Sequence, residues 1–115
     1  MSIDSFAAWC ARRGLLDGEG TPIRADGGAP GGVGPGWFPL LDRLVGDLIA
    51  MGWNRRLVHV KEKYGGLSFV ANGTPEMQVR IDQAEAESET ICEACGAPGE
   101  EYTGPSGWVE TLCEL

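Results

Sequence analysis

The residues with the clearest potential for chemistry are cysteines near the end of the chain. Cys92 and Cys95 form a C-x2-C pair followed by Gly96, and Cys113 comes after seventeen intervening residues. Two thiolates on one tight turn and a third on a returning hairpin are typical of zinc ribbons and treble clefs. The spacing therefore predicts a structural Zn²⁺ site, because nothing around it supplies the base and open cleft that catalytic zinc needs.

The predicted site needs a fourth ligand, because structural zinc is four-coordinate. Cys10, on a predicted N-terminal helix, is the expected donor. His59 is an alternative, although as a strand residue its ring would have to leave the solvent face. Glu114 or the terminal carboxylate would be weaker donors. Without metal, the three cysteines would stay reduced and partly buried, and the hairpin would pack through Tyr102 and Trp108.

An enzymatic site is not expected. A nucleophile, its base and an orienting group cannot be assembled from His59, the one histidine, and scattered carboxylates. Glu62 has an unusual position, since the hairpin pattern places it on an inner face beside Phe69. We expect it to form a structural ion pair with Arg55, Arg56 or an arginine of a helix.

Three helical segments and one hairpin would position the cysteines. An N-terminal helix runs from a possible N-cap at Ser2 to Gly14. GWFPLLDRLVGDLIAMGW is the clearest helix, with Pro39 in its first turn. TPEMQVRIDQAEAESETI is capped by Thr74, has an acidic outer surface and leads directly to Cys92. The predicted buried positions of these last two helices are Leu40, Leu41, Leu44, Val45, Leu48, Ile49, Met77, Ile81, Ala84, Ser88 and Ile91.

The segment LVHVKEKYGGLSFVAN predicts a β-hairpin with a two-residue turn at Gly65-Gly66. In the resulting register, Tyr64 opposes Leu67 and Lys61 opposes Val70. The face expected to join the core consists of Val60, Glu62, Tyr64, Leu67, Phe69 and Ala71. The other face presents the row His59, Lys61 and Lys63 to solvent.

The segment DGEGTPIRADGGAPGGVGPG is dominated by glycine and proline, so it can form neither a helix nor an interior strand. Its GGVGPG motif is not a phosphate-binding loop, since no Lys-Ser/Thr follows and no strand precedes it. We expect residues 17–36 to be a flexible loop inside a core unit of residues 1–91. Residues 92–115 then form a cysteine-knuckle hairpin of the same compact unit. The predicted class is α+β: two to three helices on a small antiparallel hairpin sheet, with a zinc-ribbon or treble-clef-like knuckle.

Length and composition are those of one globular domain. The chain has 115 residues, of which 43% are hydrophobic and 23% charged. No apolar run approaches the ~20 residues of a membrane span. The N-terminus lacks a basic start followed by an apolar stretch, so no secretion signal is predicted. We expect a cytoplasmic protein, where clustered cysteines more often bind metal than form disulfides.

Charge is distributed unevenly along the chain. The net charge of −8 argues against bulk attraction to nucleic acid or anionic lipid. Residues 51–72 carry the cations Arg55, Arg56, Lys61 and Lys63 against Glu62 alone. Residues 73–115 carry ten carboxylates against Arg80 alone. Two solvated faces that aid solubility would account for this pattern.

Four segments together resemble a family of small, largely uncharacterised proteins of bacteria and their phages. They are GWFPLLDRL, VKEKYGGLSFV, AEAESETICEACGAPG and GWVETLC, within residues 36–113. The family shares a K-E-K-[FY]-G-G-L hairpin, an acidic helix and a C-E-x-C-G-A-P-G module. Its members continue past the third cysteine to a His or Cys that would close the site. The resemblance implies no reaction, but it favours a function in the conflict between host and phage.

These observations predict a small acidic protein-binding module that is not an enzyme. Glu85, Glu87 and Glu89 on the acidic helix would contact a basic surface of a host nucleic-acid-handling or defence complex. Phage inhibitors of host defence, anti-CRISPR proteins among them, are similar in size and acidity. The alternative is a zinc-knuckle accessory protein that binds nucleic acid through the cations of the basic hairpin, with Trp53 and Tyr64 nearby.

Overall fold

Among the residues that the structure describes, three α-helices and a three-stranded sheet form two layers. The structure is a computed structural model that describes residues 5–27, 29–103 and 109–112, the last two strands by their backbone alone. In chain order the elements are α1 (Phe6–Arg12), β1 (Gly31–Gly32), the 3-10 helix η1 (Pro35–Trp37), α2 (Phe38–Ala50), β2 (Leu57–Lys63), β3 (Gly66–Ala71), α3 (Pro75–Ser88), β4 (Glu100–Thr103) and β5 (Val109–Leu112). The α+β class is thereby confirmed.

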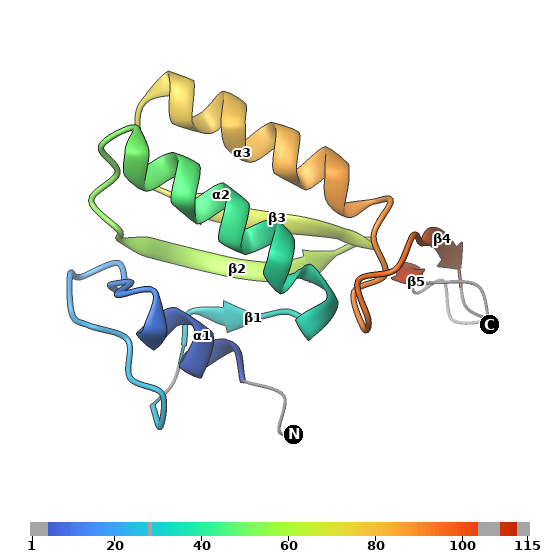
Figure 1. Cartoon of the computed structure of the whole chain (residues 1–115), viewed down its shortest axis with the longest axis horizontal. Coiled ribbons are helices and arrows are strands. Elements are labelled where there is room, and N and C mark those ends of the chain that lie inside the picture. The colour runs from blue at the N-terminus through green and yellow to red at the C-terminus, as the bar shows by residue number, and fades with distance from the viewer. Residues whose placement is uncertain (1–4, 28, 104–108, 113–115) are drawn as a thin grey trace.

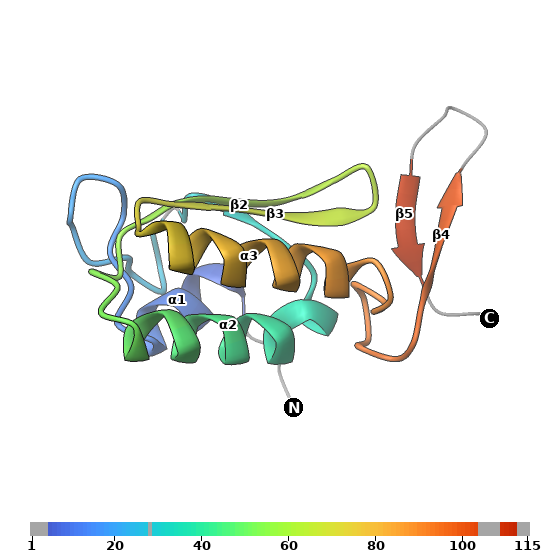
Figure 2. The ribbon, with the colours of Figure 1, turned by 90° about the horizontal axis from the view of Figure 1, so that it is seen from above.

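The core lies between the sheet and the helices. Figure 1 shows α2 and α3 running side by side across the sheet, and Figure 2 shows all three α-helices on the same side of it. Val60 and Phe69 point inward from β2 and β3, and Trp9 of α1 and Trp37 of η1 are almost fully buried. None of the described helices combines the length and hydropathy of a membrane span.

The predicted apolar faces of α2 and α3 are confirmed. All their predicted positions are buried except Ile49 and Ile91, which are half-buried against the core. Pro39 lies in the first turn of α2, where a missing N–H costs no helical hydrogen bond. Thr74 caps α3 as expected, since its hydroxyl accepts a hydrogen bond from the Met77 N–H (3.2 Å).

The first helix begins later than predicted. Ser5 is its N-cap, and the Ser5 hydroxyl accepts a hydrogen bond from the Ala8 N–H (3.1 Å). The expected cap, Ser2, lies outside the described residues. Gly14, at φ 68°, follows the helix in the left-handed conformation as predicted. On the helix, the indole N–H of Trp9 donates to Asp42 Oδ1 of α2 (2.7 Å), which fixes α1 against α2.

The predicted hairpin turn is wrong by one residue. The two turn residues are Tyr64 and Gly65, with φ angles of 53° and 84°, and Lys63 pairs with Gly66. Consecutive positive φ angles define a type I′ turn, whose twist matches that of the flanking strands. A turn at Gly65-Gly66 would have placed Tyr64 on the core face. Instead its side chain is 77% exposed.

The alternation of faces survives the shift in register, because each residue stays on its own side of the strand. Val60, Leu67 and Phe69 are buried as predicted. Glu62 is half-buried at the inner edge, but its carboxylate accepts a hydrogen bond from the Gly65 N–H (2.7 Å) and holds the turn. The ion pair expected for Glu62 is therefore replaced by a backbone contact.

Part of the segment expected to be a flexible loop forms an edge strand. Gly31 of β1 pairs in parallel with Val60 of β2, so the sheet has the order β1-β2-β3 and is mixed rather than purely antiparallel. The Val60 N–H donates to the Pro30 carbonyl (2.9 Å). A Cβ on Gly31, which has φ 104°, would lie 1.9 Å from the Val60 carbonyl oxygen. Two glycines therefore allow a strand where the composition indicated none.

Side chains of α3 occupy the opposite edge of the sheet. The Leu67 N–H donates to Ser88 Oγ (2.8 Å), and the Phe69 N–H donates to Glu85 Oε2 (2.9 Å). The Ser88 hydroxyl in turn donates to the Glu85 carbonyl (2.6 Å). Alternate N–H groups of an edge strand point to the same side. Two side chains of α3 that are one helical turn apart can therefore accept hydrogen bonds from both N–H groups. This contact aligns α3 with β3.

We expect Ser88→Ala to lower the free energy of unfolding by about 1–3 kcal/mol, because it leaves the buried Leu67 N–H without an acceptor. Thr90→Ala is the matched control: the Thr90 hydroxyl also donates to a carbonyl three residues earlier, at Glu87, but it is exposed. Thr90→Ala should lower the free energy of unfolding by less than about 0.5 kcal/mol. Urea denaturation of both variants measures the difference, and equal losses would contradict the edge contact.

Candidate functional site

Residues 91–98 fold into the tight turn that the cysteine spacing predicted, here called the cysteine turn. Ile91 and Pro98 form a β-bridge, and the Cys92 N–H donates to the Ala97 carbonyl (2.8 Å). The Gly96 N–H donates to the Cys92 carbonyl (2.8 Å), and Gly96 takes φ 85°. A side chain would be strained at this φ angle, so glycine permits the turn that carries both thiols.

The cysteine turn is docked on η1 by backbone and side-chain hydrogen bonds. The Gly36 N–H donates to the Glu93 carbonyl (2.7 Å), and the Gly34 N–H donates to Glu93 Oε2 (2.8 Å). The indole N–H of Trp37 donates to the Ile91 carbonyl (2.9 Å). Trp37 is fully buried and begins the junction with α2. The turn is therefore joined to the core rather than tethered by α3 alone.

Gly36 makes this docking possible because two backbone segments meet at its Cα. A Cβ there would lie 2.1 Å from the Cys92 carbonyl oxygen, 2.5 Å from the Gly96 nitrogen and 2.6 Å from the Glu93 carbonyl oxygen. Distances below 3.0 Å to backbone atoms cannot be relieved by a side-chain rotation. The glycine-rich GGVGPG motif thus serves a close approach of backbones, and the sequence alone gave no sign of its partner segment.

The described residues contain part of the predicted metal centre. Cys92 is buried and Cys95 is exposed, both on the cysteine turn. β4 and β5 pair in the predicted hairpin, from Glu100 with Leu112 to Thr103 with Val109. Cys113 and Glu114 lie outside the described residues. A turn with two thiols and a following glycine fits zinc as far as it is described.

Cys10, the expected fourth ligand, lies in the hydrophobic core. In the part of the chain that is described, no three His, Cys, Asp or Glu side chains form a group that could hold a metal. Cys10 is fully buried on α1. Burial raises the pKa of its thiol to about 12, which opposes the thiolate that zinc requires. His59, the alternative fourth ligand, is a half-buried residue of β2 and is not part of such a group either.

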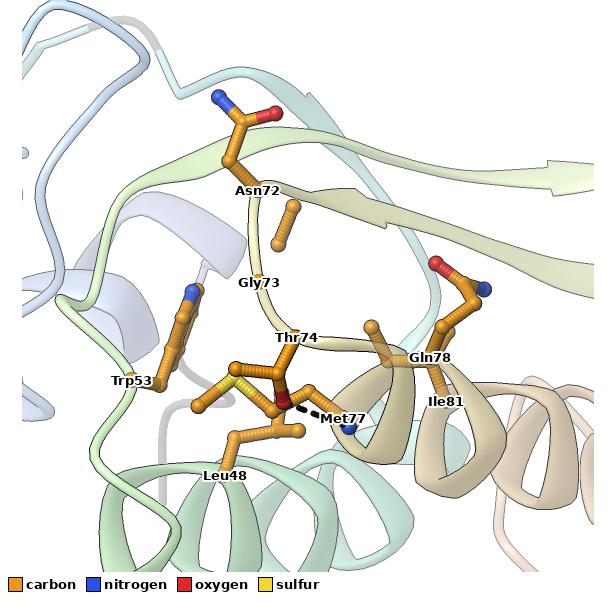
Figure 3. Close-up of a pocket in the computed structure, with 9 residues that line it drawn as sticks. Leu48, Trp53, Asn72, Gly73, Thr74, Met77, Gln78 and Ile81 are labelled. Carbon is orange, nitrogen blue, oxygen red and sulfur yellow. Dashed lines mark hydrogen bonds between the residues drawn. The ribbon is translucent and has the colours of Figure 1, made fainter.

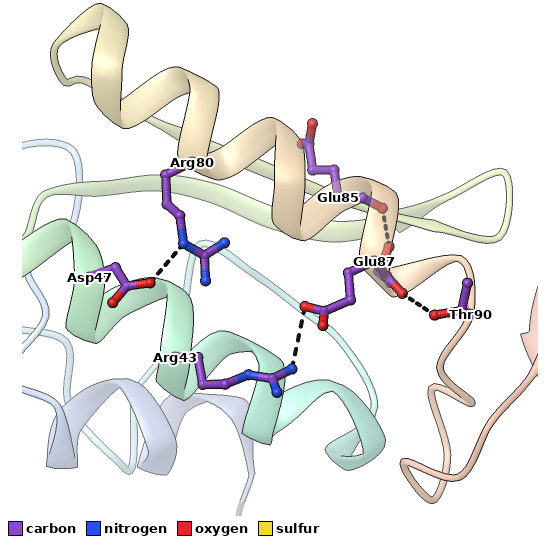
Figure 4. A network of polar contacts seen from close by, with 7 residues as sticks. Arg43, Asp47, Arg80, Glu85, Glu87 and Thr90 are labelled. Carbon is purple, nitrogen blue, oxygen red and sulfur yellow. Dashed lines mark hydrogen bonds and ion pairs between the residues drawn. The ribbon is translucent and has the colours of Figure 1, made fainter.

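The three glutamates predicted to form a contact surface differ in their surroundings. Glu85 is half-buried and holds the β3 edge. Glu87 forms an ion pair with Arg43 of α2 (3.3 Å), and Figure 4 shows this pair beside Arg80 and Asp47. Glu89 is exposed just beyond the end of α3. Glu87 and Glu89 are therefore exposed residues, whereas the carboxylate of Glu85 faces the sheet.

The four cations of the predicted basic hairpin fall into two groups. Arg55 and Arg56 precede β2, and their guanidinium groups lie over Gly14 and Gly20 of the N-terminal segment. Lys61 and Lys63 are exposed in the second half of β2. At about 3.3 Å per residue, Arg56 and Lys63 are roughly 20 Å apart. The structure does not gather the four side chains into one patch.

A shallow hollow between α2, α3 and the end of β3 has no acid–base group in its lining. Figure 3 shows Leu48, Trp53 and Met77 around it, with Thr74 at the start of α3. Its remaining lining residues are Ala71, Asn72, Gly73, Gln78 and Ile81. The buried indole N–H of Trp53 has no hydrogen-bond partner among the described residues. This hollow therefore offers apolar contact rather than acid–base chemistry.

Gly36→Ala and Gly46→Ala should change stability in opposite directions. At Gly36 the added methyl meets three backbone atoms, so we expect a loss of about 1–3 kcal/mol, the usual range for overpacking, or more. Gly46 lies inside α2 with nothing within 4 Å of the added Cβ. There, alanine should gain about 0.5–1 kcal/mol through its helix propensity. Urea denaturation measures both, and a neutral Gly36→Ala would contradict the close approach.

Comparisons with known proteins identify no relative of this chain. No family model matches the chain, and neither the curated proteins nor the solved structures include a significant match. The resemblance to small bacterial and phage proteins consequently stays a prediction from the hairpin and cysteine motifs. The arguments about function that follow rest on the geometry and charge of the chain itself, together with that prediction.

Proposed function

We propose that the chain is a small acidic protein-binding module of the cytoplasm without catalytic activity. Its C-terminal acidic surface would occupy a basic groove on a nucleic-acid-handling or host-defence complex and exclude the nucleic acid from it. The anti-CRISPR-like setting comes from the resemblance to phage proteins and from the size and acidity that such inhibitors share. The phage or prophage origin belongs to the same proposal.

The observation that carries this proposal is the position of Arg80. It is the one cation among residues 73–115, and its guanidinium is turned toward α2, where Nε donates to Asp47 Oδ2 (2.7 Å). The Arg80 side chain is only 20% exposed. As Figure 4 shows, the cation lies at the seam between the helices. Within the described residues, the outer surface of α3 is left with the carboxylates Glu76 and Asp82 as its exposed charges, and Glu87 is exposed at the seam beside Arg43.

The proposal also includes a structural Zn²⁺ held by Cys92 and Cys95, with Cys113 as the third thiolate. Bound zinc would close the cysteine turn and fix the base of the β4–β5 hairpin. Because the turn is hydrogen-bonded to η1, this binding energy would also stabilise the junction between β1 and α2. The metal's role is structural, and no step of chemistry is assigned to it.

Reversing charges on α3 tests the protein-binding surface. We expect Glu87→Lys with Glu89→Lys to reduce capture of the partner from host lysate at least tenfold, measured by quantitative mass spectrometry. Glu85 is left unchanged, since its carboxylate accepts a hydrogen bond from the Phe69 N–H and the loss of this bond would disturb the fold. The exposed Glu87–Arg43 pair costs little to break, about 0–1 kcal/mol.

The matched control is Glu19→Lys with Asp26→Lys, two exposed carboxylates of the N-terminal segment. It shifts the net charge equally, from −8 to −4, without touching α3. Capture should persist in this control. If both double variants lose the partner equally, net charge rather than the α3 surface is responsible. If the α3 variant still captures it, the proposed surface is wrong.

Metal analysis of the purified protein tests the zinc site. We expect one equivalent of zinc, lost in Cys92→Ser and retained in Cys10→Ala, because Cys10 lies in the core away from the cysteine turn. Zinc that disappears in Cys10→Ala, while the variant keeps its native circular dichroism, would instead identify Cys10 as a ligand. A metal-free protein purified under reducing conditions would contradict the site.

A further inference from the structure

The face of the sheet turned away from the helices is open. Figure 2 shows no described helix on that side of β2 and β3. Its outward positions are Val58, His59, Lys61, Lys63, Ser68 and Val70. None of them is a carboxylate, in a chain whose net charge is −8. Lys61 has no ion-pair partner within the described part of the chain, so its charge faces solvent.

Tyr64 stands at the end of this face in an unfavourable backbone conformation. Its φ of 53° is uncommon for any residue but glycine, asparagine or aspartate, and type I′ turns favour those residues. Nevertheless the residue is 77% exposed, so core packing does not account for its conformation. The Lys63 ammonium lies 6.0 Å from the ring centroid, which groups an exposed aromatic face with the two lysines.

We propose that this open sheet face, with Tyr64 at its end, binds single-stranded nucleic acid. Lys61 and Lys63 would contact consecutive phosphates, Tyr64 would stack on a base, and the methyl groups of Val58 and Val70 would contact neighbouring bases. Flat sheet faces that combine cations with an exposed aromatic ring are used for single strands in this way. A duplex hides its base faces inside the stack and cannot use Tyr64.

Net charge does not oppose this contact at moderate salt. The outward carboxylates of α3, Glu76 and Asp82, are separated from the sheet by the thickness of a helix, which is about 10 Å. The Debye length is also about 10 Å at 0.1 M salt. The attraction between the phosphates and the lysines in contact with them is therefore stronger than the screened repulsion from the distant carboxylates.

The carboxylates of Glu62 and Glu85 accept backbone N–H groups on the inner side and at the edge of the sheet, and Glu89 lies beside Gly66, so none of the three is an outward position of the open face. A strand lying on the open face would therefore meet a locally cationic surface. This site is independent of the acidic surface proposed above.

Fluorescence anisotropy with a labelled twelve-nucleotide oligothymidine tests the proposal. With two phosphates neutralised, the slope of log Kobs against log salt should be about −1.4, given roughly −0.7 per phosphate on a single strand. Lys63→Ala should halve this slope. Arg24→Ala is the control, since it removes an exposed cation paired with Asp26 away from the sheet, and it should leave the slope and affinity unchanged.

Tyr64→Asn separates binding from folding. Asparagine tolerates positive φ better than tyrosine, so the melting temperature should stay equal or rise. The affinity for oligothymidine should nevertheless fall about tenfold, because one stacked base is lost. Unchanged affinity would contradict the role of Tyr64. The proposal is overturned by equally tight binding of polyglutamate or of the matching duplex, by an effect of Arg24→Ala equal to that of Lys63→Ala, or by no detectable binding at 50 mM salt.

Discussion

The fold depends on a close approach between two backbones, that of η1 and that of the cysteine turn. Gly36 has no Cβ, so its Cα can lie against the Cys92 and Glu93 carbonyls and the Gly96 amide. The contact closes the molecule, because η1 connects the edge strand β1 to helix α2 while the turn follows α3. Segments almost sixty residues apart in sequence are thereby joined at one point, and the position of the two thiols is set by the core.

The two edges of the sheet are satisfied by different means, and this explains the two unlike faces of the molecule. On one side the glycine strand β1 pairs with Val60, and on the other Ser88 and Glu85 accept hydrogen bonds from the edge N–H groups of β3. The β1 pairing and the Ser88 and Glu85 hydrogen bonds all lie at the edges of the sheet. They therefore leave the face turned away from the helices uncovered. Carboxylates outnumber cations on α2 and α3, whereas Lys61 and Lys63 lie on the open sheet face.

Helix periodicity, caps and the cysteine turn could be predicted because each depends on residues close in sequence, as Thr74, Gly14 and Gly96 illustrate. The hairpin turn was misplaced because Gly65-Gly66 satisfies the rule for positive φ better than Tyr64-Gly65 does, and the half-buried Glu62 carboxylate holds the observed turn. β1, the docking at Gly36 and the inward role of Glu85 could not be predicted, since each depends on a partner more than fifteen residues away. The position of Cys10 could not be predicted either, since its helix packs into the core, and its participation in a metal site stays a prediction.

Hydrogen exchange tests the docking of the cysteine turn most directly. The Gly36 N–H and the Trp37 indole N–H both donate to backbone carbonyls of the cysteine-turn segment. If the docking is as firm as the core, they should exchange with the same opening free energy as the Val60 N–H in the middle of the sheet. Exchange of the Gly36 N–H near the rate of an unprotected amide, while the Val60 N–H stays protected, would show that the turn is only tethered and would contradict the account.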